Sequence, residues 1–131
     1  MSAIEVEVLA GRTLVITVDN RLSTADVSRY LDAMTVLLDS GEPFSMITDY
    51  RAGRPRKDAE GHRLEREWLA EHRPRLRGVL VAVALVHHSG PLRRAVERVA
   101  MSAAGRRLFG CPCRPFSELD DALTWIRRLQ P

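Results

Sequence analysis

The second half of the chain reads Gly78-Val-Leu-Val-Ala-Val-Ala-Leu-Val-His-His-Ser-Gly90, in which eight apolar residues, Val79 to Val86, run into two histidines. A short, valine-rich apolar run bounded by turn residues is typical of a strand buried on both faces. Such a strand needs neighbouring strands on each side and helices above and below it. We therefore predict a central strand of an α/β sheet here and interpret the rest of the chain around it.

Length and composition predict one domain over residues 1–131. A hydrophobic share of 45% and a charged share of 28% are ordinary for a soluble globular chain. No apolar run approaches the roughly 20 residues of a membrane helix, and the N-terminus lacks the basic-then-apolar order of a signal peptide. These features predict a cytoplasmic protein without membrane insertion.

Charge is distributed unevenly along the chain. Residues 1–50 carry 3 basic and 8 acidic side chains, whereas residues 51–77 carry 9 basic and 5 acidic ones. Residues 78–131 are again basic, with 8 against 4. Lys57 is the sole lysine, so the basic side chains are otherwise arginines. The basic middle of the chain is a candidate surface for phosphate groups or for an acidic partner.

Periodicity predicts five strands and four helices. The strands are expected at 4–9, 13–18, 44–49, 79–86 and 111–116, with the first two as a hairpin. The first, whose apolar and polar residues alternate most clearly, is expected nearer an edge, and the last, which contains prolines, at an edge. A first helix is expected after Ser23, capped by that residue with Asp26, and a second from Asp58 to about His72, before Pro74. The third is expected from Pro91 to before Gly105 with Ala103 on its buried face, and the last after Ser117 with Leu129 on its buried face.

The resulting order, β-β-α-β-α-β-α-β-α, resembles the bacterial SpoIIAA-like domains, which are related to the STAS and CRAL-TRIO folds. The likeness is carried by Ile47-Thr-Asp-Tyr-Arg51 before a proline-containing loop and a helix with a Trp, and by the long central strand leading to a helix. The closing segment Phe116-Ser-Glu-Leu-Asp-Asp-Ala-Leu-Thr-Trp-Ile-Arg127 carries it further. The resemblance implies an α/β fold with a single mixed five-stranded sheet, a β-hairpin followed by parallel βαβ units, flanked by four helices.

The same resemblance implies a regulatory or protein-interaction module, not an enzyme. STAS domains of the anti-sigma-antagonist type bind partner proteins and are switched by phosphorylation of a Ser at the start of the second helix. The matching segment here, Asp49-Tyr-Arg-Ala-Gly-Arg54, contains no Ser or Thr. The usual phosphoswitch is therefore not expected. CRAL-TRIO relatives bind lipids in an enlarged cavity, for which the short helices predicted here leave little room.

Polar residues at the predicted strand ends form the main candidate site. Asp49, Tyr50 and Arg51 follow one strand, and His87-His88-Ser89 follow the central one. Ligands of open α/β sheets bind at the carboxyl ends of parallel strands. Asp49 could serve there as a base, a histidine as an acid or ligand, and Arg51 as an anion clamp. The alternative is that Asp49 caps the following loop and pairs with Arg51 in a purely structural role.

Two further groups give weaker signals. The loop residues Arg51, Arg54, Arg56 and Lys57 could meet an acidic partner, but an aromatic content of 5% leaves no stacking platform and does not favour nucleic acid. Cys111, Cys113, His87 and His88 have the right atoms for zinc, although the cysteine spacing is unlike that of structural zinc sites. No metal or cofactor is predicted.

The leading hypothesis is a non-catalytic module that binds another protein or a second copy of itself. Trp125, beside Arg127 and Arg128, would belong to such an interface if exposed and to the rim of the core if packed. The alternative hypothesis is a small-ligand-binding protein or minor enzyme with a pocket at Asp49, Arg51 and His87.

Overall fold

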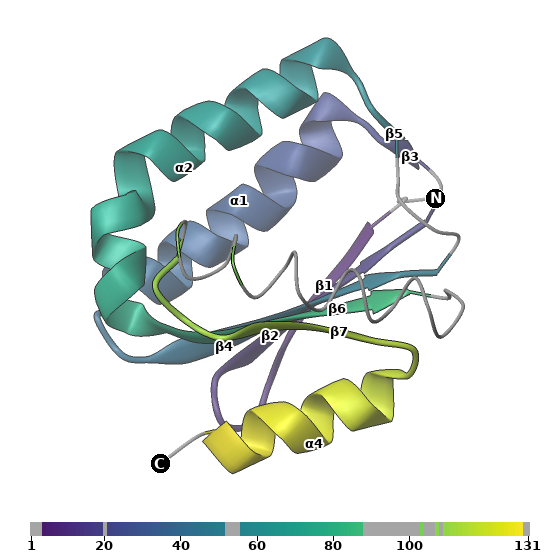
Figure 1. Ribbon diagram of the computed structural model, residues 1–131. Helices are drawn as coiled ribbons and strands as arrows, with labels where there is room; N and C mark the ends of the chain where they lie inside the picture. The colour runs from purple at the N-terminus through teal and green to yellow at the C-terminus, as the bar shows by residue number, and fades with distance from the viewer. Residues whose placement is uncertain are drawn as a thin grey trace.

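The computed structural model describes residues 4–19, 21–51, 56–87, 103, 107 and 109–129 of the chain. Ten elements lie in this part, and Figure 1 shows their arrangement. The strands are β1 (Ile4–Leu9), β2 (Thr13–Val18), β3 (Arg21–Leu22), β4 (Phe44–Tyr50), β5 (Arg56–Lys57), β6 (Leu80–His87) and β7 (Cys113–Phe116). The helices are α1 (Thr24–Asp39), α2 (Ala59–Val79) and α4 (Leu119–Leu129).

The main sheet has five strands in the order β1-β2-β4-β6-β7. β1 pairs with β2 as an antiparallel hairpin, and the remaining neighbours are parallel. The predicted mixed sheet, with its hairpin and parallel crossovers, is therefore confirmed, as are the edge positions of the first and last strands. α1 and α2 lie on one face of the sheet and α4 lies on the other, so the fold has three layers (Figure 1).

β6, formed by the apolar run that ends at Val86, is an interior strand, but its burial alternates. Ala82, Ala84 and Val86 are buried in the layer beneath α4, whereas Val83 on the opposite face is only half-buried. The prediction of burial on both faces is therefore wrong for the face turned away from α4. α4 packs on the face of β6 that carries Ala82, Ala84 and Val86, whereas Val83 packs at the margin of the core cluster beneath α1 and α2.

α1 begins as the sequence predicts. The Ser23 hydroxyl accepts a hydrogen bond from the Asp26 backbone N–H at 3.1 Å, and the Asp26 carboxylate accepts one from the Ser23 backbone N–H at 2.9 Å. This reciprocal capping box satisfies two backbone donors that the first helical turn leaves without partners. The buried stripe of the helix faces the sheet and α2; it consists of Val27, Tyr30, Leu31, Met34, Leu37 and Leu38.

α2 starts at the predicted cap, Asp58, but does not stop before Pro74; it continues to Val79. The prediction of an end near His72 is wrong. A proline inside a helix costs about 3 kcal/mol because it removes one hydrogen bond and crowds the preceding turn. Packing offsets that cost here. Leu76, two residues after Pro74, is fully buried, and Arg75 donates to the Asp39 carboxylate of α1 at 2.8 Å.

A second, two-stranded sheet joins β3 to β5 in parallel, pairing Arg21 with Arg56 and Leu22 with Lys57. From the sequence, Arg56 and Lys57 were expected in a loop and Leu22 at the opening of the first helix. Each strand has only two residues, which is too short for a periodic pattern to reveal. This small sheet holds the start of α1 beside the start of α2.

The end of the chain agrees with the sequence in outline. The third helix, predicted from Pro91, falls largely outside the described residues; Ala103 is helical but exposed, contrary to its predicted burial. In α4, Ala122 and Ile126 are buried, whereas Leu129, expected on the same face, is 38% exposed. Among the described residues, no helix combines the length and apolar character that crossing a bilayer requires.

Candidate functional site

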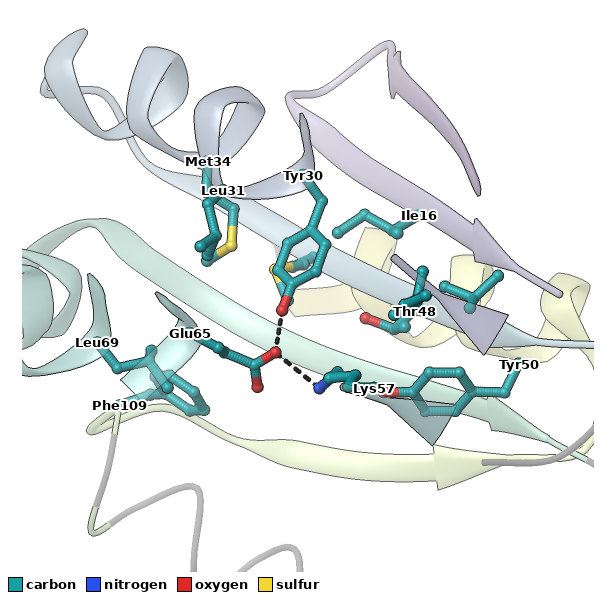
Figure 2. A pocket seen from close by; sticks show the side chains of 13 residues that line it. Ile16, Tyr30, Leu31, Met34, Thr48, Tyr50, Lys57, Glu65, Leu69 and Phe109 are labelled. Carbon is teal, nitrogen blue, oxygen red and sulfur yellow. Dashed lines mark hydrogen bonds and ion pairs between the residues drawn. The ribbon is translucent and has the colours of Figure 1, made fainter. Parts of the chain in front are cut away.

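A cavity of about 100 Å³ lies between α1, α2 and the sheet (Figure 2). Its walls are mostly apolar, and its polar groups come from α1, α2, β4 and β5. The apolar wall includes Ile16, Leu31, Met34, Met46, Leu69 and Phe109, and the polar lining consists of Tyr30, Thr48, Tyr50, Lys57 and Glu65. Apolar walls with a few convergent polar groups are the usual composition of small-molecule sites.

Three side chains form a connected polar group in this cavity. The Tyr30 hydroxyl of α1 donates a hydrogen bond to Oε2 of Glu65 on α2. Nζ of Lys57 on β5 lies 2.6 Å from the same oxygen and forms an ion pair with it. Figure 2 shows the three side chains converging on that one oxygen atom. We refer to Tyr30, Lys57 and Glu65 as the cavity triad.

The cavity triad is shielded from solvent. The Tyr30 residue is 8% exposed, and the Lys57 and Glu65 side chains are 15% and 29% exposed. Burial raises the pKa of Tyr30 well above its usual range, and the negative charge of Glu65 and the hydrogen bond to it raise it further. Tyr30 therefore remains a neutral phenol and donates a hydrogen bond to the carboxylate.

The first turns of α1 and α2 position the triad. The Asp58 carboxylate accepts from the Gly61 backbone N–H at 2.6 Å and from the Thr24 hydroxyl at 3.1 Å, so one cap residue joins the starts of both helices. Gly61 permits their close approach, since a Cβ there would stand 3.2 Å from Cγ2 of Val27. Lys57 directly precedes this cap. The junction therefore places its ammonium opposite Glu65, two turns into α2.

The strand-end residues are also brought together, as the sequence predicts. Asp49 lies opposite Val86 and Tyr50 opposite His87 in the β4–β6 register. With Arg51 they line an open hollow of about 310 Å³, which Ser117 and Glu118 complete on the α4 side. Like the cavity between α1, α2 and the sheet, this hollow opens to solvent, but its lining is more polar.

The other predicted site residues are only partly described. Arg54, His88 and Ser89 lie outside the described residues, and Arg56 is described only as a backbone position in β5. Lys57, from the same basic loop, points into the cavity and pairs with Glu65. The basic-loop hypothesis is therefore wrong for this residue, because its charge is satisfied inside the protein.

Cys111 and Cys113 are buried free thiols in the core beneath α1 and α2. The Cys113 thiol donates to the Cys111 carbonyl oxygen at 3.7 Å. Hydrogen bonding between the two thiols, followed by burial, raises the pKa of Cys111, which keeps that thiol protonated. Within the described ranges, no three His, Cys, Asp or Glu side chains converge as metal ligands.

Sequence reasoning did not find the cavity triad. Its members lie 8 and 35 residues apart and belong to three different elements. Tyr30 falls on the apolar stripe of α1, where it reads as an ordinary core residue. One signal was present in the sequence, namely the single lysine in a chain that otherwise uses arginine.

Comparison with known proteins places the fold. No family model matches the chain, and no curated protein matches it either. A solved structure does: an uncharacterized protein of the DUF3478 family with a SpoIIAA-like fold, from Shewanella loihica. The TM-score is 0.58 at 17% sequence identity, and the match covers 94% of this chain and 91% of the other. This chain therefore has a SpoIIAA-like fold, and the fold that the resemblance implied is confirmed.

Proposed function

We propose that this SpoIIAA-like domain is a non-catalytic binding module whose ligand is a small apolar molecule with one polar group. The observation that carries the proposal is the apolar cavity with the cavity triad at its polar end. Its walls favour apolar atoms because transfer from water is worth roughly 25 cal/mol per Å² of apolar surface. The triad supplies directional partners that select how the ligand is oriented.

The size of the cavity limits the ligand. A volume of about 100 Å³ is below the ~300–1,000 Å³ of pockets for drug-sized molecules. An apolar cavity of roughly 150 Å³ holds benzene in another protein. We therefore expect ligands of about four to six non-hydrogen atoms, such as short alcohols, and not the long acyl chains of lipids.

Filling the cavity tests this proposal. Leu69 is a half-buried wall residue on α2, so the helix can accept a larger side chain at this position. We expect Leu69→Trp to weaken the binding of 1-butanol at least tenfold, about 1.4 kcal/mol, because the indole takes the ligand's place. Binding is measured by two-dimensional NMR titration of the labelled protein.

The matched control is Val36→Trp, at a position of α1 that is 71% exposed and outside the cavity lining. It should leave butanol affinity unchanged. Equal affinity in Leu69→Trp and the unaltered protein would contradict the proposal. So would chemical-shift changes confined to Asp49 and His87, which would move the ligand to the strand-end hollow.

A protein partner is a second candidate, and one observation favours it. Within the described part of the chain, Arg114 Nε is buried without a hydrogen-bond partner, and its guanidinium lies 5.1 Å from the Phe116 ring centroid. Phe116 in turn packs on Trp125, and Arg128 lines the same hollow. Trp and Arg are enriched at binding hot spots. Two arginines beside aromatic rings suit a partner segment that carries carboxylates.

A tetra-glutamate peptide probes this second candidate. If the hollow accepts an acidic segment, the peptide should shift the indole N–H resonance of Trp125. The chain has two tryptophans, so this resonance has to be distinguished only from that of Trp68. Arg128→Glu should abolish the shift, and Arg127→Glu, outside the hollow lining, serves as the control. An indole resonance that does not move at any peptide concentration removes this candidate.

A further inference from the structure

We propose that Lys57 captures a small aldehyde in the cavity as a reversible imine, an inference that rests on the proposed ligand-binding function and names its ligand class. Three observations meet at this residue. Its ammonium lines an apolar cavity, its side chain is only 15% exposed, and a carboxylate lies 2.6 Å from its Nζ. Partial burial in an apolar pocket is the setting in which proteins use lysines for Schiff bases, and the carboxylate is a proton acceptor within reach.

The residue type itself supports the inference. Lys57 is the sole lysine among 20 basic side chains. An arginine at this position would also pair with Glu65 and could donate two hydrogen bonds to its carboxylate. Arginine, however, does not give up its proton in proteins and cannot form an imine. Among the described residues that line the cavity, the basic side chain is thus one with amine chemistry.

The step balances with the groups present. Glu65 accepts a proton from the Lys57 ammonium, since their separation lies within the range for direct transfer. The neutral amine forms a carbon–nitrogen bond with the aldehyde carbon, and the carbonyl oxygen leaves as water with two protons from the nitrogen. One of these passes through Glu65. The protonated imine keeps the positive charge beside the Glu65 carboxylate, so the ion pair survives and hydrolysis reverses the step.

Tyr30 is a positioning residue for this reaction. Its hydroxyl holds the Glu65 oxygen that faces Lys57, and α1 packs the phenol ring in the core. The carboxylate therefore stays within reach of both nitrogen and substrate while the ligand exchanges. The small cavity limits the substrate to short aldehydes, such as butanal.

Reductive trapping tests the inference on the full chain. The protein is incubated at pH 7 with butanal and sodium cyanoborohydride, and the butylated sites are located by peptide mass spectrometry. The α-amino group is an internal reference, because at this pH a free lysine side chain is protonated far more completely. We expect Lys57 to be butylated at least as fast as the α-amino group, and this preference to vanish in concentrated urea. Butylation of the α-amino group alone would overturn the inference.

Two variants separate chemistry from binding. Glu65→Gln, which keeps the side-chain shape, should slow butylation of Lys57 at least tenfold while leaving the α-amino rate unchanged; an unaltered Lys57 rate would overturn the role of Glu65. Lys57→Arg should abolish trapping in the cavity, because arginine cannot form an imine. If the unaltered protein binds butanol without trapping butanal, the imine fails and the proposed function stands. If it binds neither, both fail.

Discussion

Phe44→Ala is expected to lower the free energy of unfolding by about 3–5 kcal/mol. Phe44 opens β4, is 1% exposed and belongs to the core cluster beneath α1 and α2. Truncation to alanine removes the transfer free energy of the ring and leaves a void, because neighbours such as Leu38 and Leu80 close it only in part. Urea unfolding followed by circular dichroism measures the loss, provided the slope of the transition is unchanged.

Two variants complete this experiment. Phe44→Leu keeps most of the apolar volume and should cost less than half as much as the alanine variant. Val36→Ala, at a position 71% exposed, should stay within about 0.5 kcal/mol of the unaltered protein. An alanine variant at Phe44 that loses less than about 1 kcal/mol would mean that this end of β4 does not support the core.

Ionisation of Tyr30 is expected to lower the free energy of unfolding at alkaline pH. Its folded-state pKa is raised by burial and by Glu65, so the folded protein holds the phenolic proton more tightly than the unfolded chain does. The stability from this group is fully present below the unfolded pKa of about 10. It is lost as pH rises above that value, at about 1.4 kcal/mol per pH unit. A rise of about 1.5 pH units above that value therefore removes about 2 kcal/mol of the free energy of unfolding.

Tyr30→Phe isolates this contribution. At pH 7 the variant lacks the hydrogen bond to the Glu65 carboxylate and should be less stable by about 1.5–3 kcal/mol. Above pH 10 it has no phenol to titrate at this position, so its stability should fall less steeply and approach that of the unaltered protein. Parallel stability curves from pH 7 to 11.5 would show that Tyr30 is not held neutral by its surroundings. Urea unfolding at each pH value provides the measurement.

These stability predictions bear on function, because Tyr30 and Phe44 serve the same layer of the fold. The cavity exists where the side chains of that layer fail to meet between α1, α2 and the sheet. Protein interiors normally fill such space, and a void costs stability. A cavity beside a partly buried ion pair is consistent with the proposed ligand binding, which would offset that cost.

The local elements were largely predictable from the sequence. Ser23 and Asp26 predicted the start of α1, because a capping box depends only on residues close together in the sequence. The alternating residues of β1 revealed an edge strand with one wet face. The length of α2 was not predictable, because Pro74 is a strong local stop signal. Only the burial of Leu76 and the Arg75–Asp39 pair, both tertiary, override it.

The strand-end site and the cavity show the same division. Asp49 and His87 could be placed together in advance, because the carboxyl ends of parallel neighbouring strands meet at one edge of the sheet. The cavity triad could not, since no sequence spacing relates a tyrosine on one helix to a carboxylate on another. The prediction that Lys57 belongs to a basic binding loop was wrong for the same reason, because its partner, Glu65, is brought to it only by the tertiary structure.

By itself, then, the sequence determined the strands of the main sheet and the helices around it, because apolar periodicity, caps and turn residues act over a few positions and leave few ways to assemble a sheet. Only the tertiary structure decided where the cavity lies and which side chains line it. The helix crossing leaves a space of about 100 Å³ and turns Tyr30, Lys57 and Glu65 into it. The physical reason is that voids, and the charges that face them, depend on how side chains distant in the chain pack against one another.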